Sequence, residues 1–473
     1  MRDTRTESRR TLGLRGFRPD RAALLTVACV VVGFAAGYLP VFSGLPPAAR
    51  VTLQILVTAT LLWVTEAMPP FAVGVLAMAA EIALLGRPGG VFARDPGEWE
   101  TFVRPWGSPV VWLFLGGLVL ASAATKTRLD QELAAAVLRR VSRGPRSLLF
   151  ACMGITFVFS MFVSNTASTS MMMAVTAPLL RGRPERDRFS RALCLAIPLG
   201  ASVGGMGTPI GSPPNAVVIG LLGSAAPPFA TWMLLAVPPA TVLLLVCGWV
   251  LGHYVRRCEL SIDWSGMGKN EASTNGVAPW QRALVVAVFV LTVGLWLTTG
   301  LHGVPVAVVS FVPLAVLTTA RVVEPDDIRQ LPWDVLLLLA GGMSLGVAVQ
   351  ETGLATWLVD NLAPQGASPR ALALALGAVT CLLSNVMSNT AATNVLAPIA
   401  LAMVGAGSVA PLVSLALCAS LATALPASTP PNAIAFASGR LHSRDFLRTG
   451  AIVAVVGVPV TVLWCWTAVG SLL

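Results

Sequence analysis

The sequence predicts an all-α membrane protein that crosses the bilayer many times. Of its 473 residues, 55% are apolar and only 11% are charged, whereas charged residues make up roughly 25% of a typical soluble domain. Apolar stretches of about 18 residues or more also recur along the whole chain, and a helix of that length can cross a hydrocarbon core of roughly 30 Å. These two observations define the fold class.

Nine of the stretches are long and continuously apolar, and we expect each to form a membrane span. In chain order they lie near residues 22–45, 51–68, 69–86, 108–125, 229–252, 282–300, 303–320, 333–350 and 447–471. Four further apolar stretches contain polar residues or Pro and Gly, and are the most informative part of the chain. They lie near residues 147–180, 190–223, 369–405 and 408–437.

Positive charges gather between the expected spans. If the basic segments all face one side of the membrane, they hold 27 of the 32 Lys and Arg residues. The five on the other side are Arg50, Arg87, Arg94, Arg104 and Arg370. The positive-inside rule then places the N-terminus in the cytosol and the C-terminus outside, which for a bacterial chain means the cytoplasmic membrane. The net charge of +10 therefore indicates topology and contact with anionic lipid rather than nucleic-acid binding.

Four features of the first half recur in the second half at an offset of about 225 residues. The Gly116-Gly117 pair aligns with Gly341-Gly342, inside two similar apolar segments. The motif "SMFVSNTAST" (160–169) parallels "SNVMSNTAAT" (384–393), and "GSPPNAVVIG" (211–220) parallels "STPPNAIAFASG" (428–439). The chain is therefore expected to consist of a basic cytosolic tail and two repeats joined by a polar cytosolic linker. Their ranges are 1–21 for the tail, 22–257 and 282–473 for the repeats, and 258–281 for the linker.

The two repeats are expected to be inverted relative to each other. The first Ser-Asn-Thr segment follows a basic, cytosolic loop, whereas the second follows a charge-poor loop near Arg370 on the other face. Each segment lies halfway along about 35 apolar residues that must begin and end on the same face, which predicts two re-entrant hairpins. Inverted repeats of this kind are typical of secondary transporters, whose sites lie near the membrane midplane.

The remaining repeated pieces predict broken helices. Glycines and prolines in "GMGTPIGSPPN" (205–215) and "LPASTPPN" (425–432) interrupt the backbone hydrogen bonds of a helix. A break creates two new helix ends, of which the carbonyl end suits a small hard cation and the amide end suits an anion. A single such motif is most often a kink or a packing contact between helices, but the ordered, matched repetition favours a ligand site.

These motifs resemble the divalent-anion/sodium symporter family, the dicarboxylate, citrate and sulfate carriers. The similarity covers almost the whole chain and includes "WVTEAMP" (63–69), the Gly-Gly spans, both Ser-Asn-Thr motifs and both Pro-Pro-Asn breaks. The resemblance implies about 11 transmembrane helices plus two re-entrant hairpins, divided into scaffold and transport domains that move in an elevator mechanism. It also implies a homodimer that needs no prosthetic cofactor and uses Na⁺ as the coupling ion.

The resemblance also implies specific site residues. The first sodium site would comprise Ser160, Ser164, Asn165 and Gly211. The second sodium site would comprise Ser384, Met387, Asn389 and Ser428. The substrate site between them would comprise Asn165, Thr166, Ser212, Pro213, Asn389, Thr390, Thr429 and Pro430. Two residues depart from the family pattern, since Asn385 and Met387 stand where an acid and a small residue are expected.

The leading functional hypothesis is sodium-coupled transport of small dicarboxylates such as succinate, malate or fumarate. A sodium-independent dicarboxylate exchanger, or a sulfate or citrate carrier of the same fold, is the nearest alternative. A membrane-embedded enzyme is the distant alternative, because the polar residues at depth are Ser, Thr and Asn, without an acid, His or Lys beside them. Glu66 and Glu81, near span ends, are expected to be solvated or hydrogen-bonded acids.

Overall fold

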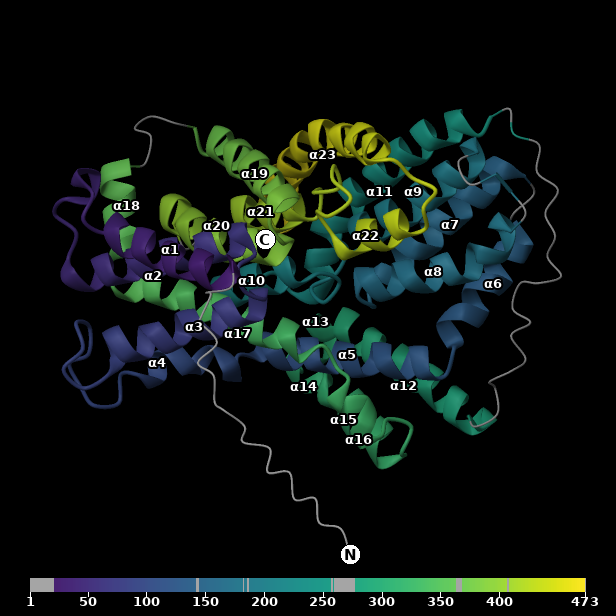
Figure 1. The fold of residues 1–473 in the computed structure, drawn as a ribbon. Helices are drawn as coiled ribbons and strands as arrows, with labels where there is room; N and C mark the ends of the chain where they lie inside the picture. Colours follow the sequence, from purple (N-terminus) through teal and green to yellow (C-terminus); the bar gives the residue numbers. More distant parts are fainter. Residues whose placement is uncertain are drawn as a thin grey trace, which may run out of the picture.

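The structure, a computed structural model, describes residues 21–141, 144–181, 183–184, 187–256, 258, 277–362, 368–405 and 408–472. The expected tail, apart from Arg21, and most of the expected linker lie outside these residues. Within them every regular element is helical (Figure 1). Seven helical segments of the described chain are long and apolar enough to cross a membrane. The prediction of an all-α polytopic membrane protein is therefore confirmed.

Most helices of the first half begin at or near the expected positions. They are α1 (Arg21–Ala36), α2 (Pro47–Thr65), α3 (Pro70–Glu81), α4 (Glu100–Val103), α5 (Pro109–Lys126), α6 (Leu129–Val141), α7 (Pro145–Ser160), α8 (Asn165–Leu180), α9 (Arg188–Gly204), α10 (Pro213–Leu222) and α11 (Phe229–Tyr254). A π-helical turn, Ile82–Gly86, extends α3. Many of these helices begin with proline, whose fixed φ suits the first turn, where its missing amide hydrogen is not needed.

The second half follows the same order. Its helices are α12 (Pro279–Leu297), α13 (Thr299–His302), α14 (Val306–Val309), α15 (Phe311–Thr319), α16 (Pro325–Arg329), α17 (Trp333–Glu351), α18 (Leu354–Leu362), α19 (Pro369–Val386), α20 (Asn389–Val404), α21 (Val409–Ala419), α22 (Pro430–Ala437) and α23 (Ser443–Leu472). The short helices α4, α6, α16 and α18 lie outside the predicted spans. Of these, α6 and α18 each follow a Gly-Gly helix and are too short, and too polar on one side, to register as spans.

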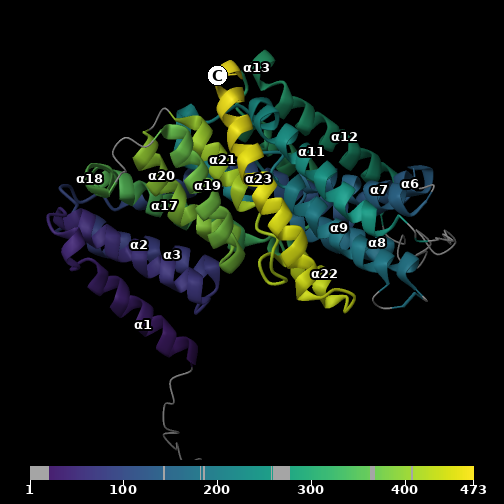
Figure 2. The same cartoon turned by 90° about the horizontal axis from the view of Figure 1, so that it is seen from above.

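Two helix pairs and two interrupted helices carry the repeated motifs (Figures 1 and 2). The first hairpin consists of α7 and α8, and the second of α19 and α20. The first break, residues 205–212, separates α9 from α10, and the second break, residues 420–429, separates α21 from α22. The helix after each break packs on the other half: α10 contacts α20 and α21, whereas α22 contacts α8 and α9.

The repeated Gly-Gly pairs allow helices to approach closely. A Cβ atom added to Gly341 of α17 would lie 2.6 Å from the carbonyl carbon of Gly74 in α3. On α5, a Cβ atom added to Gly116 would lie 2.5 Å from the carbonyl oxygen of Ser310, just before α15. Since α17 also packs against α20, it joins the N-terminal helices to the second hairpin.

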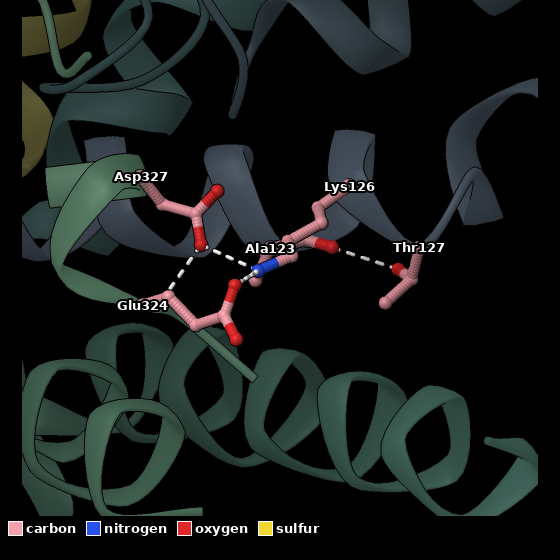
Figure 3. A network of polar contacts seen from close by, with 5 residues as sticks. All are labelled: Ala123, Lys126, Thr127, Glu324 and Asp327. Atoms are coloured by element: carbon pink, nitrogen blue, oxygen red, sulfur yellow. Dashed lines mark hydrogen bonds and ion pairs between the residues drawn. The ribbon is translucent and has the colours of Figure 1, made fainter. Parts of the chain in front are cut away.

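A polar network outside the hairpins joins the two halves (Figure 3). Lys126, at the end of α5, donates from Nζ to Glu324 Oε2 at 2.9 Å and to Asp327 Oδ2 at 2.6 Å. The same Asp327 oxygen accepts the backbone N–H of Glu324 at 2.7 Å. One lysine of the first half is therefore held by two acids of the second half.

Candidate functional site

Four helices begin at the residues expected to bind substrate. The first residues of α8, α10, α20 and α22 are Asn165, Pro213, Asn389 and Pro430. The residues immediately before them, which cap these helices, are Ser164, Ser212, Ser388 and Thr429. The residues predicted to bind substrate therefore gather at helix N-termini.

Three of these caps satisfy a backbone amide of their own helix. Ser164 Oγ accepts from the backbone N–H of Ala167 at 3.2 Å, and Ser388 Oγ accepts from that of Ala391 at 3.2 Å. Thr429 Oγ1 accepts from the backbone N–H of Asn432 at 3.3 Å. The hydroxyl of Ser212 makes no such bond with α10. The motif residues thus fix where each helix begins.

The N-termini of the four helices supply positive potential without any charged side chain of their own. None of the four helices contains Asp, Glu, Lys or Arg. Each helix N-terminus carries roughly half a positive charge from its aligned peptide dipoles. An arrangement of this kind suits a small anion held by backbone amides and hydroxyl groups.

The first proposed sodium site lies between the first hairpin and the first break. The end of the Asn165 side chain faces three oxygens: Ser160 Oγ at 2.6 Å, Gly211 O at 3.2 Å and Ala201 O at 3.3 Å. The hydrogen-bonding pattern assigns the amide nitrogen to this position, where it donates to all three. Ser160 is buried, whereas Ser164 is exposed and used as a cap. The structure thus brings together Ser160, Asn165 and Gly211.

The second proposed sodium site has a different set of contacts. Ser384 Oγ and Asn389 Oδ1 are buried, and neither has a hydrogen-bond partner within the described residues. Met387 is buried where α19 ends, and Ser428 Oγ donates to the backbone oxygens of Ala422 at 3.0 Å and Leu425 at 2.8 Å. Among the described residues, Ser384 Oγ and Asn389 Oδ1 are therefore without a hydrogen-bond donor. Within the same residues, no hydrogen bond joins these two hairpin residues to Ser428.

Asn385, rather than Ser428, connects the second hairpin to the second break. Its Oδ1 accepts the backbone N–H of Ala424, in the second break, at 2.9 Å, and its Nδ2 donates to Cys381 O at 2.8 Å. The amide supplies both an acceptor and a donor here. An ionised acid at this position could accept from Ala424 but could not donate to Cys381, so the departure from the family pattern fits its surroundings.

The expected substrate residues differ in exposure. Thr166 and Pro430 are exposed, and Asn165, Pro213 and Asn389 are half-buried. Ser212, Thr390 and Thr429 are buried. The helix starts thus keep part of their polar surface accessible.

Two asparagines outside the predicted site residues support the breaks. Asn215 Nδ2 donates to Gly205 O at 2.9 Å and Thr208 O at 2.8 Å. In the second half, Asn432 Nδ2 donates to Leu425 O at 2.9 Å and Thr423 O at 3.2 Å. The repetition of Asn after Pro-Pro in both halves is the sequence signal for this role. A buried amide that follows a helix break can donate to the carbonyl groups that the break leaves unpaired.

Comparison with known families agrees with this architecture. Residues 60–417 and 295–473 match the sequence profile of a family described as citrate transporter. The chain belongs to the citrate transporter family. It is therefore a multi-pass membrane transporter rather than an enzyme, as the sequence motifs predicted.

The resemblance to divalent-anion/sodium symporters is likewise confirmed by relatives of similar length. The sodium-dependent dicarboxylate transporter SdcS of Staphylococcus saprophyticus is 29% identical over 441 residues, covering 85% of this chain and 82% of the relative. SdcS of Staphylococcus aureus strain bovine RF122 is 28% identical over 438 residues, with the same coverage of 85% and 82%.

Two solved transporters share the fold of this citrate-transporter family member. The YdaH transporter of Alcanivorax borkumensis aligns with a TM-score of 0.56 at 14% identity, covering 85% of this chain and 98% of that one. MtrF of Neisseria gonorrhoeae aligns with a TM-score of 0.55 at 12% identity and covers 95% of each chain.

Proposed function

We propose that this protein is a secondary transporter that couples sodium to the movement of small C4-dicarboxylates, such as succinate, malate and fumarate, across the cytoplasmic membrane. The observation that carries the proposal is the start of four uncharged helices at the repeated Ser-Asn-Thr and Pro-Pro-Asn motifs. The names of the 28–29% identical relatives support the dicarboxylate and the sodium dependence. Citrate is the second candidate, since the family description names it.

The anion would lie between the two halves. The packing of α10 on α20, and of α22 on α8, supports a single site formed by all four helix starts. Asn165, Thr166, Asn389 and Thr390 would contact the carboxylates from the hairpins. The break residues Ser212, Pro213, Thr429 and Pro430 would contact them from the broken helices.

Sodium would supply the positive charge that the side chains do not. At about 6 Å and an effective dielectric near 20, one pair of opposite unit charges is worth roughly 3 kcal/mol. Bound sodium would therefore raise the affinity for the anion, and by linkage the anion would raise the affinity for sodium.

The first sodium site fits this role because its ligands are all oxygens. In the structure the amide nitrogen of Asn165 satisfies Ser160 Oγ, Gly211 O and Ala201 O. With Na⁺ among these oxygens, Asn165 would turn its amide so that Oδ1 faces the cation. The buried oxygens of Ser384 and Asn389 support the second site in the same way.

The family resemblance extends the proposal to the whole molecule. We propose a homodimer in the cytoplasmic membrane, with a cytosolic N-terminus and the C-terminus outside. The two repeats would be inverted, and their hairpins and broken helices would form the transport domain of an elevator. α11 and α23, which pack on α9 and α21, would move with them, and the scaffold would come from the other helices.

A thermal-shift screen tests the substrate class and the cation together. The purified protein is heated with succinate, malate, fumarate, citrate or sulfate, each with sodium or potassium. Binding to the native state raises the unfolding temperature, and we expect the largest rise with a C4-dicarboxylate and sodium. A rise that is the same in potassium would contradict the coupling, and a rise with sulfate alone would contradict the substrate class.

Site variants test the assigned residues. We expect Asn165→Ala and Asn389→Ala to lose the succinate-induced shift and most of the succinate uptake. Ser160→Ala and Ser384→Ala should raise the sodium concentration needed for half-maximal uptake. Asn361→Ala is the matched control, because within the described residues the side chain of this exposed asparagine of α18 bonds to Trp357 O of its own helix, at 2.9 Å. Full transport by Asn165→Ala or Asn389→Ala would refute the assignment.

A further inference from the structure

A pocket rich in arginine lies at the ends of three helices, away from the proposed transport site. Arg188 and Arg191 come from the first turn of α9, Tyr254 is the last residue of α11, and Arg444 and Arg448 come from the start of α23. The residues form an open pocket of about 460 Å³ and an adjoining cavity of about 40 Å³, which share Arg191 and Arg448. We call this feature the arginine pocket.

The arginine pocket carries positive charge that its one acid does not neutralise. Asp445 is buried and pairs with Arg191, which donates to both carboxylate oxygens. The backbone N–H of His442 donates to Asp445 Oδ2 at 2.9 Å, so both oxygens of this carboxylate already accept hydrogen bonds. Arg188, Arg444 and Arg448 form no ion pair within the described residues, and all three are exposed.

The position of the pocket matches the boundary of the membrane. Phe229–Tyr254 and Ser443–Gly470 are two of the candidate membrane spans, and both have one end at the pocket. Tyr254 is 47% exposed, and exposed tyrosine is typical of the headgroup region. The same two helices expose large apolar side chains, including Trp249 at 73% on α11 and Val455 at 74% on α23.

These features favour a ligand with both a phosphate and acyl chains. Guanidinium groups bind phosphate oxygens through paired, charge-assisted hydrogen bonds. Basic pockets between membrane helices suit anionic headgroups, and the neighbouring apolar helix faces suit lipid tails. A zwitterionic choline headgroup is less suitable, because its cation would face Arg188, Arg444 and Arg448, which have no ion-pair partner among the described residues.

We propose that the arginine pocket binds the phosphate headgroup of an anionic phospholipid of the phosphatidylglycerol class. The bound lipid joins the start of α9 to α11 and α23, which pack on one another (Figure 2). Since α9 leads directly into the first break, the lipid stabilises the helix that positions the proposed sodium site. The lipid site is independent of which anion is transported and of whether sodium is coupled.

The test measures the unfolding temperature of the purified protein in detergent with added lipid. Short-chain phosphatidylglycerol is compared with phosphatidylcholine and, in a separate arm, with inorganic phosphate at the same concentration. We expect phosphatidylglycerol to raise the unfolding temperature more than phosphatidylcholine or phosphate does. If inorganic phosphate alone reproduced the whole rise in unfolding temperature, the ligand would be a free phosphate and not a lipid. Equal rises with phosphatidylglycerol and phosphatidylcholine would refute the proposed site.

Variants locate the effect. We expect Arg188→Gln combined with Arg448→Gln to reduce the phosphatidylglycerol-induced rise to about half or less of its original value. Arg140→Gln, an exposed arginine of α6 that lines neither cavity, should leave the rise unchanged. Native mass spectrometry of the same proteins should show one retained phosphatidylglycerol fewer per chain in the double variant. If that variant keeps both the full rise and the bound lipid, the proposal is wrong. Should the double variant not fold, Arg448→Gln alone gives the same comparison.

Discussion

Asn215 and Asn432 occupy the same position in the two halves and make the same kind of contact. Each follows a Pro-Pro pair at a helix start, is buried, and donates from Nδ2 to carbonyl oxygens of the break before it. The carbonyls that a broken helix leaves unpaired are costly inside a membrane protein. We therefore regard both asparagines as positioning residues that keep the breaks open in a single conformation.

We expect Asn215→Asp and Asn432→Asp to destabilise the protein strongly. Aspartate has the size of asparagine but, when ionised, offers only acceptors to a set of carbonyl oxygens. Unpaired buried groups cost about 1–3 kcal/mol each, so the unfolding temperature in detergent should fall by several degrees. Asn361→Asp, on the exposed face of α18, should change it little. Unchanged stability of both break variants would show that the amide bonds are dispensable.

Glu81 is a buried acid in α3 whose neighbours determine its protonation. It contacts Ser344 Oγ of α17, and the same hydroxyl lies 2.8 Å from Phe102 O. A neutral Glu81 that donates to Ser344 leaves the single hydroxyl hydrogen of Ser344 for Phe102 O, whereas an ionised Glu81 would have to share that hydrogen with Phe102 O. Glu81 is 0% exposed, which also disfavours an unpaired charge.

The neutral acid makes different predictions for two substitutions of Glu81. Glutamine can donate its amide hydrogen to Ser344, so Glu81→Gln should unfold within about 1 kcal/mol of the original protein. Alanine removes the donor and leaves a cavity between α3 and α17, so Glu81→Ala should lose about 2–4 kcal/mol. Chemical or thermal unfolding of both variants checks the difference. A large loss in Glu81→Gln would mean that the charged form is needed.

The contact between α7 and α9 is the packing on which the first sodium site depends. A Cβ atom added to Gly204 would lie 2.3 Å from Phe157 O, and one added to Gly200 would lie 2.5 Å from Met153 O. Both obstacles are backbone atoms, which cannot move independently of their helix. The two glycines, one helical turn apart, therefore let the first hairpin lie directly against the helix that leads into the break.

Gly204→Ala should accordingly separate α7 from α9 and disturb the contact of Asn165 with Ala201 and Gly211. We expect a loss of stability of more than about 2 kcal/mol, typical of overpacking, together with a higher sodium requirement for uptake. Gly294→Ala is the matched control, since nothing lies within 4 Å of the added Cβ in α12. At position 294, alanine should stabilise α12 slightly, by about 0.5–1 kcal/mol, because alanine favours a helix more than glycine does. Equal effects of the two substitutions would contradict the close-packing explanation.

Much of this arrangement could be predicted from the sequence because local chemistry determines it. The starts of α10 and α22 follow from Pro-Pro, which cannot lie inside a helix but suits its first turn. The Ser-Asn-Thr motifs supply the caps of α8 and α20. The short helices α6 and α18 escaped prediction because an apolar window about 18 residues long cannot detect a helix of 13 or 9 residues with one polar face.

Long-range packing could not be predicted in the same way. The crossing of α10 onto α20 and of α22 onto α8 depends on how whole helices fit together. The burial of Glu81 likewise depends on Ser344, which is 263 residues away in the chain. Asn385 looked like a defect in the motif, and only its contact with Ala424 gives it a role. Each of these contacts joins segments that lie too far apart in the sequence for a local pattern to reveal it.

The network around Lys126 connects the two halves of the molecule outside the proposed site (Figure 3). Its side chain is 31% exposed, that of Glu324 is 62% exposed and that of Asp327 is 21% exposed. Exposed ion pairs typically contribute roughly 0–1 kcal/mol. Asp327 differs from Glu324 because it is less exposed and also accepts a backbone N–H.

Asp327→Ala should therefore destabilise the protein by about 1 kcal/mol, and Glu324→Ala by less than about half of that. Asp326→Ala is the control, because this 77% exposed acid pairs, in the part of the chain that the structure describes, with Arg329 of its own short helix. Thermal unfolding at low and high salt checks the order of the three variants. Equal losses for Asp327→Ala and Asp326→Ala would mean that the contact between halves contributes nothing.

The proposed transport cycle requires sodium because the four helix starts carry no cationic side chain to offset a dianion. The most direct measurement is uptake of radiolabelled succinate into proteoliposomes, with an inward sodium gradient or with potassium in its place. We predict uptake above the protein-free background only with sodium, and competition by unlabelled malate or fumarate. Succinate uptake at the same rate in potassium as in sodium would contradict sodium-coupled transport.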